Sequence, residues 1–168
     1  MKTKMFLWTG IFVGMALAGT NVPNFTGKWV LDAKRSQVGQ ASGPGRGGMT
    51  AQQLNVIQTR DTLTIERFMS SEFRGDFTLK EKVSLDGKET LNPAPWGNRK
   101  LTASWSKDQK SLTIQSEMER PGEGQSFRMQ STEVWTLENE GKVLKLEQTR
   151  TGPAGEIHRI LYYNKAEK

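Results

Sequence analysis

Residues 108–114, Asp-Gln-Lys-Ser-Leu-Thr-Ile, form a polar turn that leads directly into alternating polar and apolar side chains. The same order recurs at residues 60–65, 85–91 and 140–146. A polar turn followed by alternation with a period of two is typical of a β-hairpin that buries one face. The repeated units therefore predict a serial antiparallel β-meander.

Alternation of this kind covers ten segments of the chain, and the links between them are short and turn-like. A parallel sheet needs crossover connections of a dozen or more residues, which these links cannot supply. An open meander has two exposed edges, and closing the sheet on itself removes both. We therefore expect an all-β fold, an antiparallel up-and-down meander barrel of about 8–10 strands. The expected strands are residues 25–31, 52–58, 63–69, 73–85, 89–91, 101–105, 112–118, 127–137, 144–150 and 157–163, and Pro93 and Pro95 are expected to mark an irregular connection.

The first 18 residues have the pattern of a signal peptide. Lys2 and Lys4 precede an apolar run, and Ala16-Leu17-Ala18 supplies the small-x-small cleavage pattern. A membrane anchor is the alternative, but the run at residues 5–18 has 14 residues, whereas a spanning helix needs about 20. We expect cleavage after Ala18, no membrane span in the mature chain, and a periplasmic or secreted protein.

Residues 19–168 are long enough for a single domain with a sizeable core. The chain has no cysteine, which excludes disulfides and thiol chemistry and fits a bacterial envelope or secreted protein. Without the two leader lysines, 22 basic and 18 acidic residues remain, with opposite charges interleaved, so nucleic-acid binding is not expected. Residues 39–48 contain five glycines and one proline and predict a flexible surface loop.

The first expected strand reads Phe-Thr-Gly-Lys-Trp-Val-Leu at residues 25–31. It resembles the opening strand of the lipocalin and fatty-acid-binding-protein superfamily, and residues 84–89 and 132–137 are similar to bacterial exported lipocalin-like domains. The resemblance implies that Gly27 and Trp29 close one end of the barrel. It also implies that a basic residue of the last strand stacks on the indole of Trp29, for which Arg159 is the candidate.

This chain differs from fatty-acid-binding proteins in two features, which limits the properties of that family that can be expected here. Fatty-acid-binding proteins place a helical lid after the first strand, where this chain has the glycine-rich loop at residues 39–48. Their last strand carries an Arg-x-Tyr pair that binds a carboxylate. In this chain, if Tyr163 corresponds to that tyrosine, the arginine position two residues earlier is occupied by Leu161. The fatty-acid site of that family is therefore not carried over to this chain.

One set of alternate positions in the expected strands is strongly apolar and should face the interior. The opposite set, which includes Thr64, Glu66, Lys80 and Lys82, is polar and should face water. The apolar set includes Trp105, Phe127, Met129 and Trp135 as candidate cavity walls, together with Leu54, Val56, Leu63, Ile65, Met69, Phe77, Leu79, Val83, Leu85, Leu101, Ala103, Leu112, Ile114, Met118, Leu137, Leu144 and Leu146.

The same phase places several polar side chains inward, and a buried charge must be paired, hydrogen-bonded or hydrated. One interpretation is a water-containing cavity in which these groups orient the head group of a ligand. The other is a closed network, for example Arg67 with Glu81 or Glu133, in a barrel filled by its own side chains. The candidate ligand-binding residues are Arg67, Glu81, Ser116, Ser131, Glu133 and Arg159, with Gln58 and Gln148 in the same phase.

The chemistry-bearing residues do not form a recognisable catalytic or metal-binding pattern. His158 is the only histidine, and with no cysteine in the chain this rules out the common metal quartets. A Ser-His-Asp relay would need partners for it, and its phase predicts exposure. No cofactor is expected. The first functional hypothesis is an exported barrel that binds a small hydrophobic molecule. A protein-interaction or structural module of the envelope using Trp96 is the second, and a hydrolase or isomerase using Glu81 or Glu133 is the third.

Overall fold

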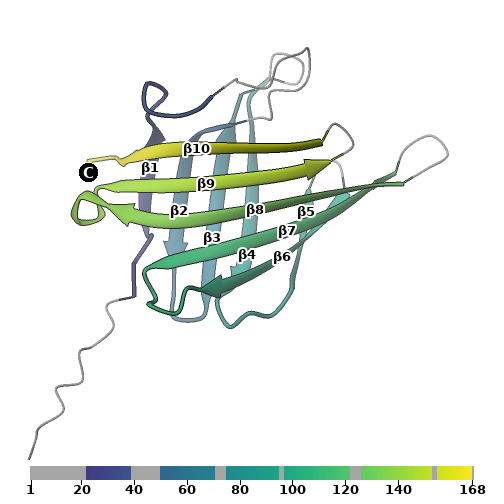
Figure 1. Ribbon diagram of the computed structural model, residues 1–168, viewed down its shortest axis with the longest axis horizontal. Coiled ribbons are helices and arrows are strands. Elements are labelled where there is room, and N and C mark those ends of the chain that lie inside the picture. The colour runs from purple at the N-terminus through teal and green to yellow at the C-terminus, as the bar shows by residue number, and fades with distance from the viewer. Residues whose placement is uncertain are drawn as a thin grey trace, which may run out of the picture.

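The computed structural model describes residues 22–38, 50–70, 75–94, 97–121, 126–152 and 155–167. Within these residues, ten strands form one antiparallel sheet in the order β4-β3-β2-β1-β10-β9-β8-β7-β6-β5. The first and last strands lie side by side, because β1 pairs with both β2 and β10. In Figure 1, strands β7 to β10 run across β2 to β4, which lie behind them. The predicted all-β meander barrel is therefore confirmed.

The observed strands overlap all ten predicted segments. The largest differences are that β4 begins at Phe77 and not at residue 73, and that β6 begins four residues earlier than expected. The strands are β1 (Gly27–Leu31), β2 (Ala51–Gln58), β3 (Thr62–Met69), β4 (Phe77–Ser84), β5 (Thr90–Ala94), β6 (Gly97–Trp105), β7 (Ser111–Pro121), β8 (Ser126–Glu138), β9 (Val143–Gly152) and β10 (Gly155–Lys165), with a 3-10 turn at Asn139–Gly141 between β8 and β9.

Strands β4 and β5 form the two ends of the sheet, and a side chain joins them where a backbone ladder is absent. The carboxamide of Asn92 accepts a hydrogen bond from the Lys82 N–H (2.7 Å) and donates one to the Lys82 carbonyl (2.9 Å). This pair of bonds replaces one rung of a strand ladder. The barrel is therefore nearly closed, and the Asn92–Lys82 contact marks its seam.

Pro93 lies inside β5 and is paired in register with Asn98 of β6. The prediction of an irregular connection at Pro93 was therefore wrong. Strand β5 lies at the end of the sheet, where the missing proline N–H does not interrupt a central ladder.

Alternation of side chains between the two faces is confirmed along the strands. The interior contains nearly all of the predicted apolar set, whereas Ile57 (53% exposed) and Phe68 (37%) lie on the outer face. Burial of this apolar set is the main source of stability for the barrel. Half-buried members of the predicted interior set are Phe77, Leu85, Trp105, Met129 and Leu137.

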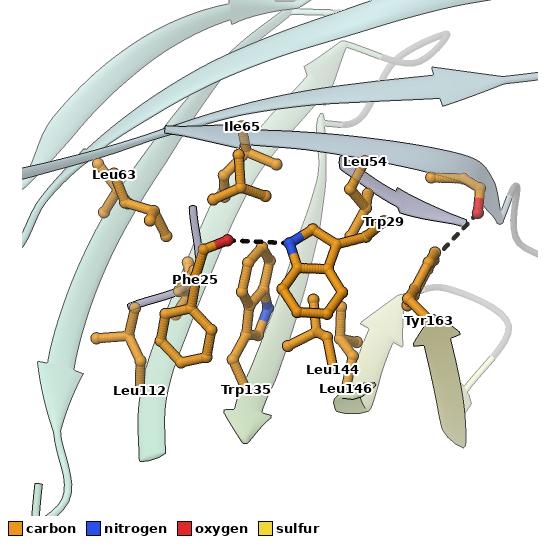
Figure 2. Close-up of a cluster of buried hydrophobic side chains, with 14 of the residues drawn as sticks. Phe25, Trp29, Leu54, Leu63, Ile65, Leu112, Trp135, Leu144, Leu146 and Tyr163 are labelled. Carbon is orange, nitrogen blue, oxygen red and sulfur yellow. Dashed lines mark hydrogen bonds between the residues drawn. The ribbon is translucent and has the colours of Figure 1, made fainter. Parts of the chain in front are cut away.

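Aromatic side chains fill one end of the interior (Figure 2). Phe25 packs edge-to-face on Trp135 with ring centroids 5.6 Å apart, and it stacks on Trp105 at 6.1 Å. The indole N–H of Trp29 donates a 2.9 Å hydrogen bond to the Phe25 carbonyl, so its polar atom is satisfied although the side chain is fully buried. Gln58 holds the segment before β1 in place by accepting the Phe25 N–H at 2.9 Å. This end of the barrel is a packed core.

Trp29 lies across this end as predicted, but the basic residue above it is not the predicted one. The ammonium of Lys165 lies 5.3 Å from the Trp29 ring, whereas Arg159 contacts Gln148 deeper inside the barrel. The assignment of Arg159 to the cation–π contact was therefore wrong. Gly27 lies beside the same pair, and its φ of +155° is a conformation that residues with a Cβ rarely adopt, which favours glycine at this position.

Some sequence predictions fall outside the described residues. They are the signal peptide at residues 1–18, the glycine-rich loop at residues 39–48, Trp96, and the side chain of Phe127. In the described ranges, no helix has the length and apolar character needed to cross a membrane.

Candidate functional site: a charged network inside the barrel

Three charged side chains meet in the barrel interior from strands that are far apart in sequence. Arg67 of β3, Glu81 of β4 and Glu133 of β8 share the inward phase of their apolar neighbours, and all three are buried. The Arg67 guanidinium donates 2.8 Å hydrogen bonds to a carboxylate oxygen of Glu81 and to one of Glu133. The predicted interior position of these residues is thus observed, and Arg67 pairs with both carboxylates as the closed-network interpretation expected.

A second guanidinium extends the network towards β6 and β7. Arg99 donates to Glu81 through Nη1 and to the Ser116 hydroxyl through Nη2, the latter at 2.9 Å. Ser116 is in turn 2.9 Å from the Ser131 hydroxyl. Both serines are half-buried and lie opposite each other in the β7–β8 register.

The network continues from Glu133 to the last strand. Gln148 donates to Glu133 at 2.7 Å and accepts from the Arg159 Nε at 2.8 Å, while Arg159 Nη1 donates to the Thr50 hydroxyl at 2.8 Å. The indole N–H of Trp135 also donates to Glu133, at 3.0 Å. We call this set the interior network: Arg67, Glu81, Arg99, Ser116, Ser131, Glu133, Gln148 and Arg159.

The network keeps Glu133 ionised despite its burial. Burial by itself raises the pKa of this carboxyl, but the opposing charge of Arg67, together with hydrogen bonds from Arg67 and Trp135, outweighs burial and lowers the pKa to about 2. The same pairing raises the pKa of Arg67 against the effect of its own burial. Glu133 therefore carries a full negative charge at neutral pH and is matched to its partners as an acceptor.

Arg150, near the end of β9, is a fourth interior guanidinium that the sequence analysis did not select. It continues the inward phase of Leu144, Leu146 and Gln148, and it is half-buried. No hydrogen bond or ion pair joins Arg150 to a described residue, in contrast to the members of the interior network. Its place in the inward alternation of the predicted strand 144–150 could have identified it as an interior residue from the sequence.

The surroundings of Arg150 are electropositive. Burial, followed by the guanidinium of Arg159 and, more weakly, those of Arg99 and Arg67, lowers its pKa to about 10, and Glu133 only partly opposes this effect. Arg150 therefore remains protonated at neutral pH in a region where cations outnumber anions. A desolvated cation beside other cations favours the binding of an anion.

Arg99 was also missed, because the predicted strand began at residue 101 and left it in a loop. The observed β6 begins at Gly97, which places Arg99 in the inward phase of Leu101 and Ala103. Asn92 was missed for a similar reason, since the prolines on either side of residue 94 concealed the strand.

The candidate wall residues lie in different parts of the barrel. Trp135 is fully buried in the aromatic core, and Trp105 is half-buried against Phe25. Met129 is half-buried and belongs to the opposite end of β8, six residues from Trp135, which corresponds to about 20 Å at about 3.4 Å per residue. The aromatic core and the end of the barrel that contains Met129 are therefore separate regions.

A surface hollow of about 300 Å³ lies at the end of the β3–β4 hairpin. It is lined by Phe68, Met69 and Phe77 among others, and no member of the interior network borders it. His158 is exposed and lies 3.1 Å from the Thr149 hydroxyl. Within the described ranges, no cluster of His, Asp or Glu side chains is arranged to hold a metal ion.

Two solved structures share this fold. The barrel is similar to zebrafish ileal bile acid-binding protein complexed with cholic acid, with a TM-score of 0.54 and 17% identity over 84% of this chain and 98% of that chain. It is also similar to a secretory abundant heat soluble (SAHS) protein from Ramazzottius varieornatus, with a TM-score of 0.55 and 11% identity over 84% of this chain and 94% of that chain. No protein-family model and no curated protein matches the chain. These likenesses show the fold alone, and the predicted lipocalin-like barrel fold is confirmed at that level.

Proposed function

We propose that this protein is an exported barrel that binds a small, largely apolar molecule non-covalently in its interior. The observation that carries the proposal is the contrast between the two ends of β7 and β8. Leu112 and Trp135 at one end are fully buried, whereas the inward-facing Ser116, Met129 and Ser131 towards the other end are only half-buried. Solvent reaches these inward side chains, and we infer that a ligand displaces it there.

The structural neighbours support a binding role at the level of the fold. One of them is named as a bile acid-binding protein and was crystallised with cholic acid, an amphiphilic molecule. The interior of the present barrel has a matching division, with an aromatic core and a charged network. Fold alone does not determine function, so the role must be tested on this chain.

Binding without catalysis is part of the proposal. Glu133, the carboxyl considered for acid or base chemistry, has a pKa of about 2 and accepts hydrogen bonds from Arg67, Trp135 and Gln148. A general acid or base works best with a pKa near the working pH. The contacts of Glu133 instead suit a structural anion that holds the network together.

The test is binding of Nile red, a neutral apolar dye, to protein purified without detergent, combined with native mass spectrometry of the same sample. We expect an enhanced, blue-shifted dye emission with a stoichiometry of one, and displacement of the dye by long-chain amphiphiles. Absence of dye binding, together with a native mass equal to that of the bare chain, would contradict the proposal. Export is tested separately by the mass of the protein recovered from the producing cell, which should correspond to residues 19–168.

A second candidate is an interaction or structural module of the envelope with a filled barrel. The packing of Phe25, Trp29 and Trp135 in Figure 2 favours it, because that part of the interior has no room for a ligand. Affinity capture from an envelope extract distinguishes the two candidates. In the module, substitution of Trp96 by alanine should release the captured partner, whereas Nile red binding should be absent from the start.

A further inference from the structure

A β-bulge lies beside the surface hollow at the end of the β3–β4 hairpin. Two alternate residues of β2, Ala51 and Gln53, pair with consecutive residues of β3, so Gln52 between them is the extra residue of the ladder. A bulge bends its strand and re-aims a side chain, and bulges are over-represented at barrel rims and next to active sites. Gln52 is exposed and lines the hollow. The irregularity of the ladder therefore coincides with the hollow.

The wall of the hollow next to Gln52 is apolar. Phe68 lines it with a side chain that is 37% exposed. Met69 and Phe77, which lie opposite each other in the β3–β4 register, also line it. Its volume of about 300 Å³ is at the lower end of the range typical of small-molecule pockets. The hollow therefore has the size and lining for a small molecule with an apolar body.

The charge of the hollow is negative. Asp76, directly before β4, is the only charged residue among the described residues that line it. Its exposed carboxylate forms no ion pair or hydrogen bond with a described residue, whereas Glu66 on the outer face of β3 pairs with Lys80 at 2.9 Å. A carboxylate and the face of a phenyl ring both attract a cation. The lining of the hollow therefore favours a positively charged ligand.

We propose that the hollow binds a small organic ammonium ion, with its positive charge between the Asp76 carboxylate and the ring of Phe68. The apolar body of the ligand packs on Met69 and Phe77, and the carboxamide oxygen of Gln52 accepts a hydrogen bond from the ammonium group. No member of the interior network borders this site. The inference goes beyond the proposed interior binding and does not depend on it.

The experiment compares three ligands that share a phenylethyl body: 2-phenylethylammonium, 2-phenylethanol and 3-phenylpropanoate. Each is titrated by NMR into the ¹⁵N-labelled wild-type protein, Asp76→Asn, Phe68→Leu and the control Asp61→Asn. Asp61 is exposed and directly precedes β3, at the opposite end of that strand from the hollow, so the control removes the same charge without changing the lining. Affinities are read from the amide signals of Gln52 and Thr78, which separates the hollow from the barrel interior.

In wild type and control, 2-phenylethylammonium should bind about 3–30-fold more tightly than 2-phenylethanol, the combined range for an exposed ion pair and an exposed cation–π contact. The anion 3-phenylpropanoate should bind more weakly than the alcohol. Asp76→Asn and Phe68→Leu should each reduce the preference for the cation by about 2–5-fold. Equal affinity of the three ligands in wild type, or a preference that is unchanged in either variant, would overturn the inference. So would shifts at Met129 and Ser131 without shifts at Gln52, and none of these results bears on interior binding of Nile red.

Discussion

Arg67 and Glu133 form an ion pair with an N–O distance of 2.8 Å that joins the two crossing layers of the barrel. Arg67 comes from β3 in the rear layer of Figure 1 and Glu133 from β8 in the front layer. Both side chains are buried, with side-chain exposures of 9% and 6%. Little of either side chain reaches bulk water, so both charges depend on partners inside the barrel, and this pair forms only when the two layers are correctly assembled.

Substitution of Arg67 by methionine should lower the free energy of unfolding by about 3–5 kcal/mol, the usual cost of removing one partner of a buried pair. It leaves Glu133 and Glu81 with one fewer cationic partner each. Urea unfolding followed by tryptophan fluorescence measures the effect. The matched control is Lys80→Met, which breaks the Lys80–Glu66 pair on the outer face of the adjacent strand, where the lysine is 69% exposed; it should cost under about 1 kcal/mol. Similar losses in both variants would contradict a special role for the buried pair.

Stability should fall steeply in acid because of Glu133. Its pKa is about 2 in the folded protein against an ordinary value of 4.5, so the unfolded chain binds the proton first as the pH falls. The stabilisation is complete above pH 4.5 and is lost between pH 4.5 and about 2, by about 3 kcal/mol in total. In Glu133→Gln this part of the pH dependence should be missing, while the exposed carboxylates contribute equally to both proteins. Parallel stability curves for the two proteins between pH 6 and 3 would refute the assignment.

The barrel could be predicted from sequence because period-two alternation is a local signal. Thr64, Ile65, Glu66 and Arg67 alternate between the outer and inner faces as their order predicts. The same phase predicted that Arg67, Glu81 and Glu133 point inward. It could not decide between a hydrated cavity and a closed network, since that choice depends on distances between strands that are remote in the chain.

Residues at strand ends were the least predictable. Arg99 and Lys165 lie just beyond the expected strand limits, and each contacts a residue that is remote in sequence, which no local pattern encodes. Asn92 was concealed by Pro93, because a proline ordinarily argues against a strand. Arg150 was within an expected strand, but what distinguishes it is that no described residue forms a hydrogen bond or ion pair with it, which only the assembled structure shows.

The seam between β4 and β5 should open when Asn92 is replaced by alanine. The variant loses both hydrogen bonds to the Lys82 backbone, which should cost about 1–3 kcal/mol. Hydrogen exchange followed by NMR should show faster exchange of the Lys82 amide, whereas amides in the β8–β9 ladder should keep their protection relative to global unfolding. Asn98→Ala, which alters an exposed asparagine of β6, is the control. An unchanged Lys82 exchange rate would show that the seam does not depend on Asn92.

Lys165, and not Arg159, should be energetically coupled to Trp29. A double-mutant cycle with Lys165→Met and Trp29→Phe should give a coupling of about 0.5–1 kcal/mol, typical of an exposed cation–π contact. Trp29→Phe alone should cost about 2 kcal/mol, because it also removes the hydrogen bond to the Phe25 carbonyl. The cycle with Arg159→Met in place of Lys165→Met should give additive effects. Coupling to Arg159 but not to Lys165 would contradict the observed closure of the barrel.

The central claim, a ligand held in the barrel interior at the end that contains Met129, is tested most directly by NMR titration of the ¹⁵N-labelled protein with dodecanoate. The account predicts saturable shifts concentrated at Ser116, Met129 and Ser131. Shifts confined to Ile57 and Phe68 on the outer face, or no shifts at millimolar dodecanoate, would contradict it.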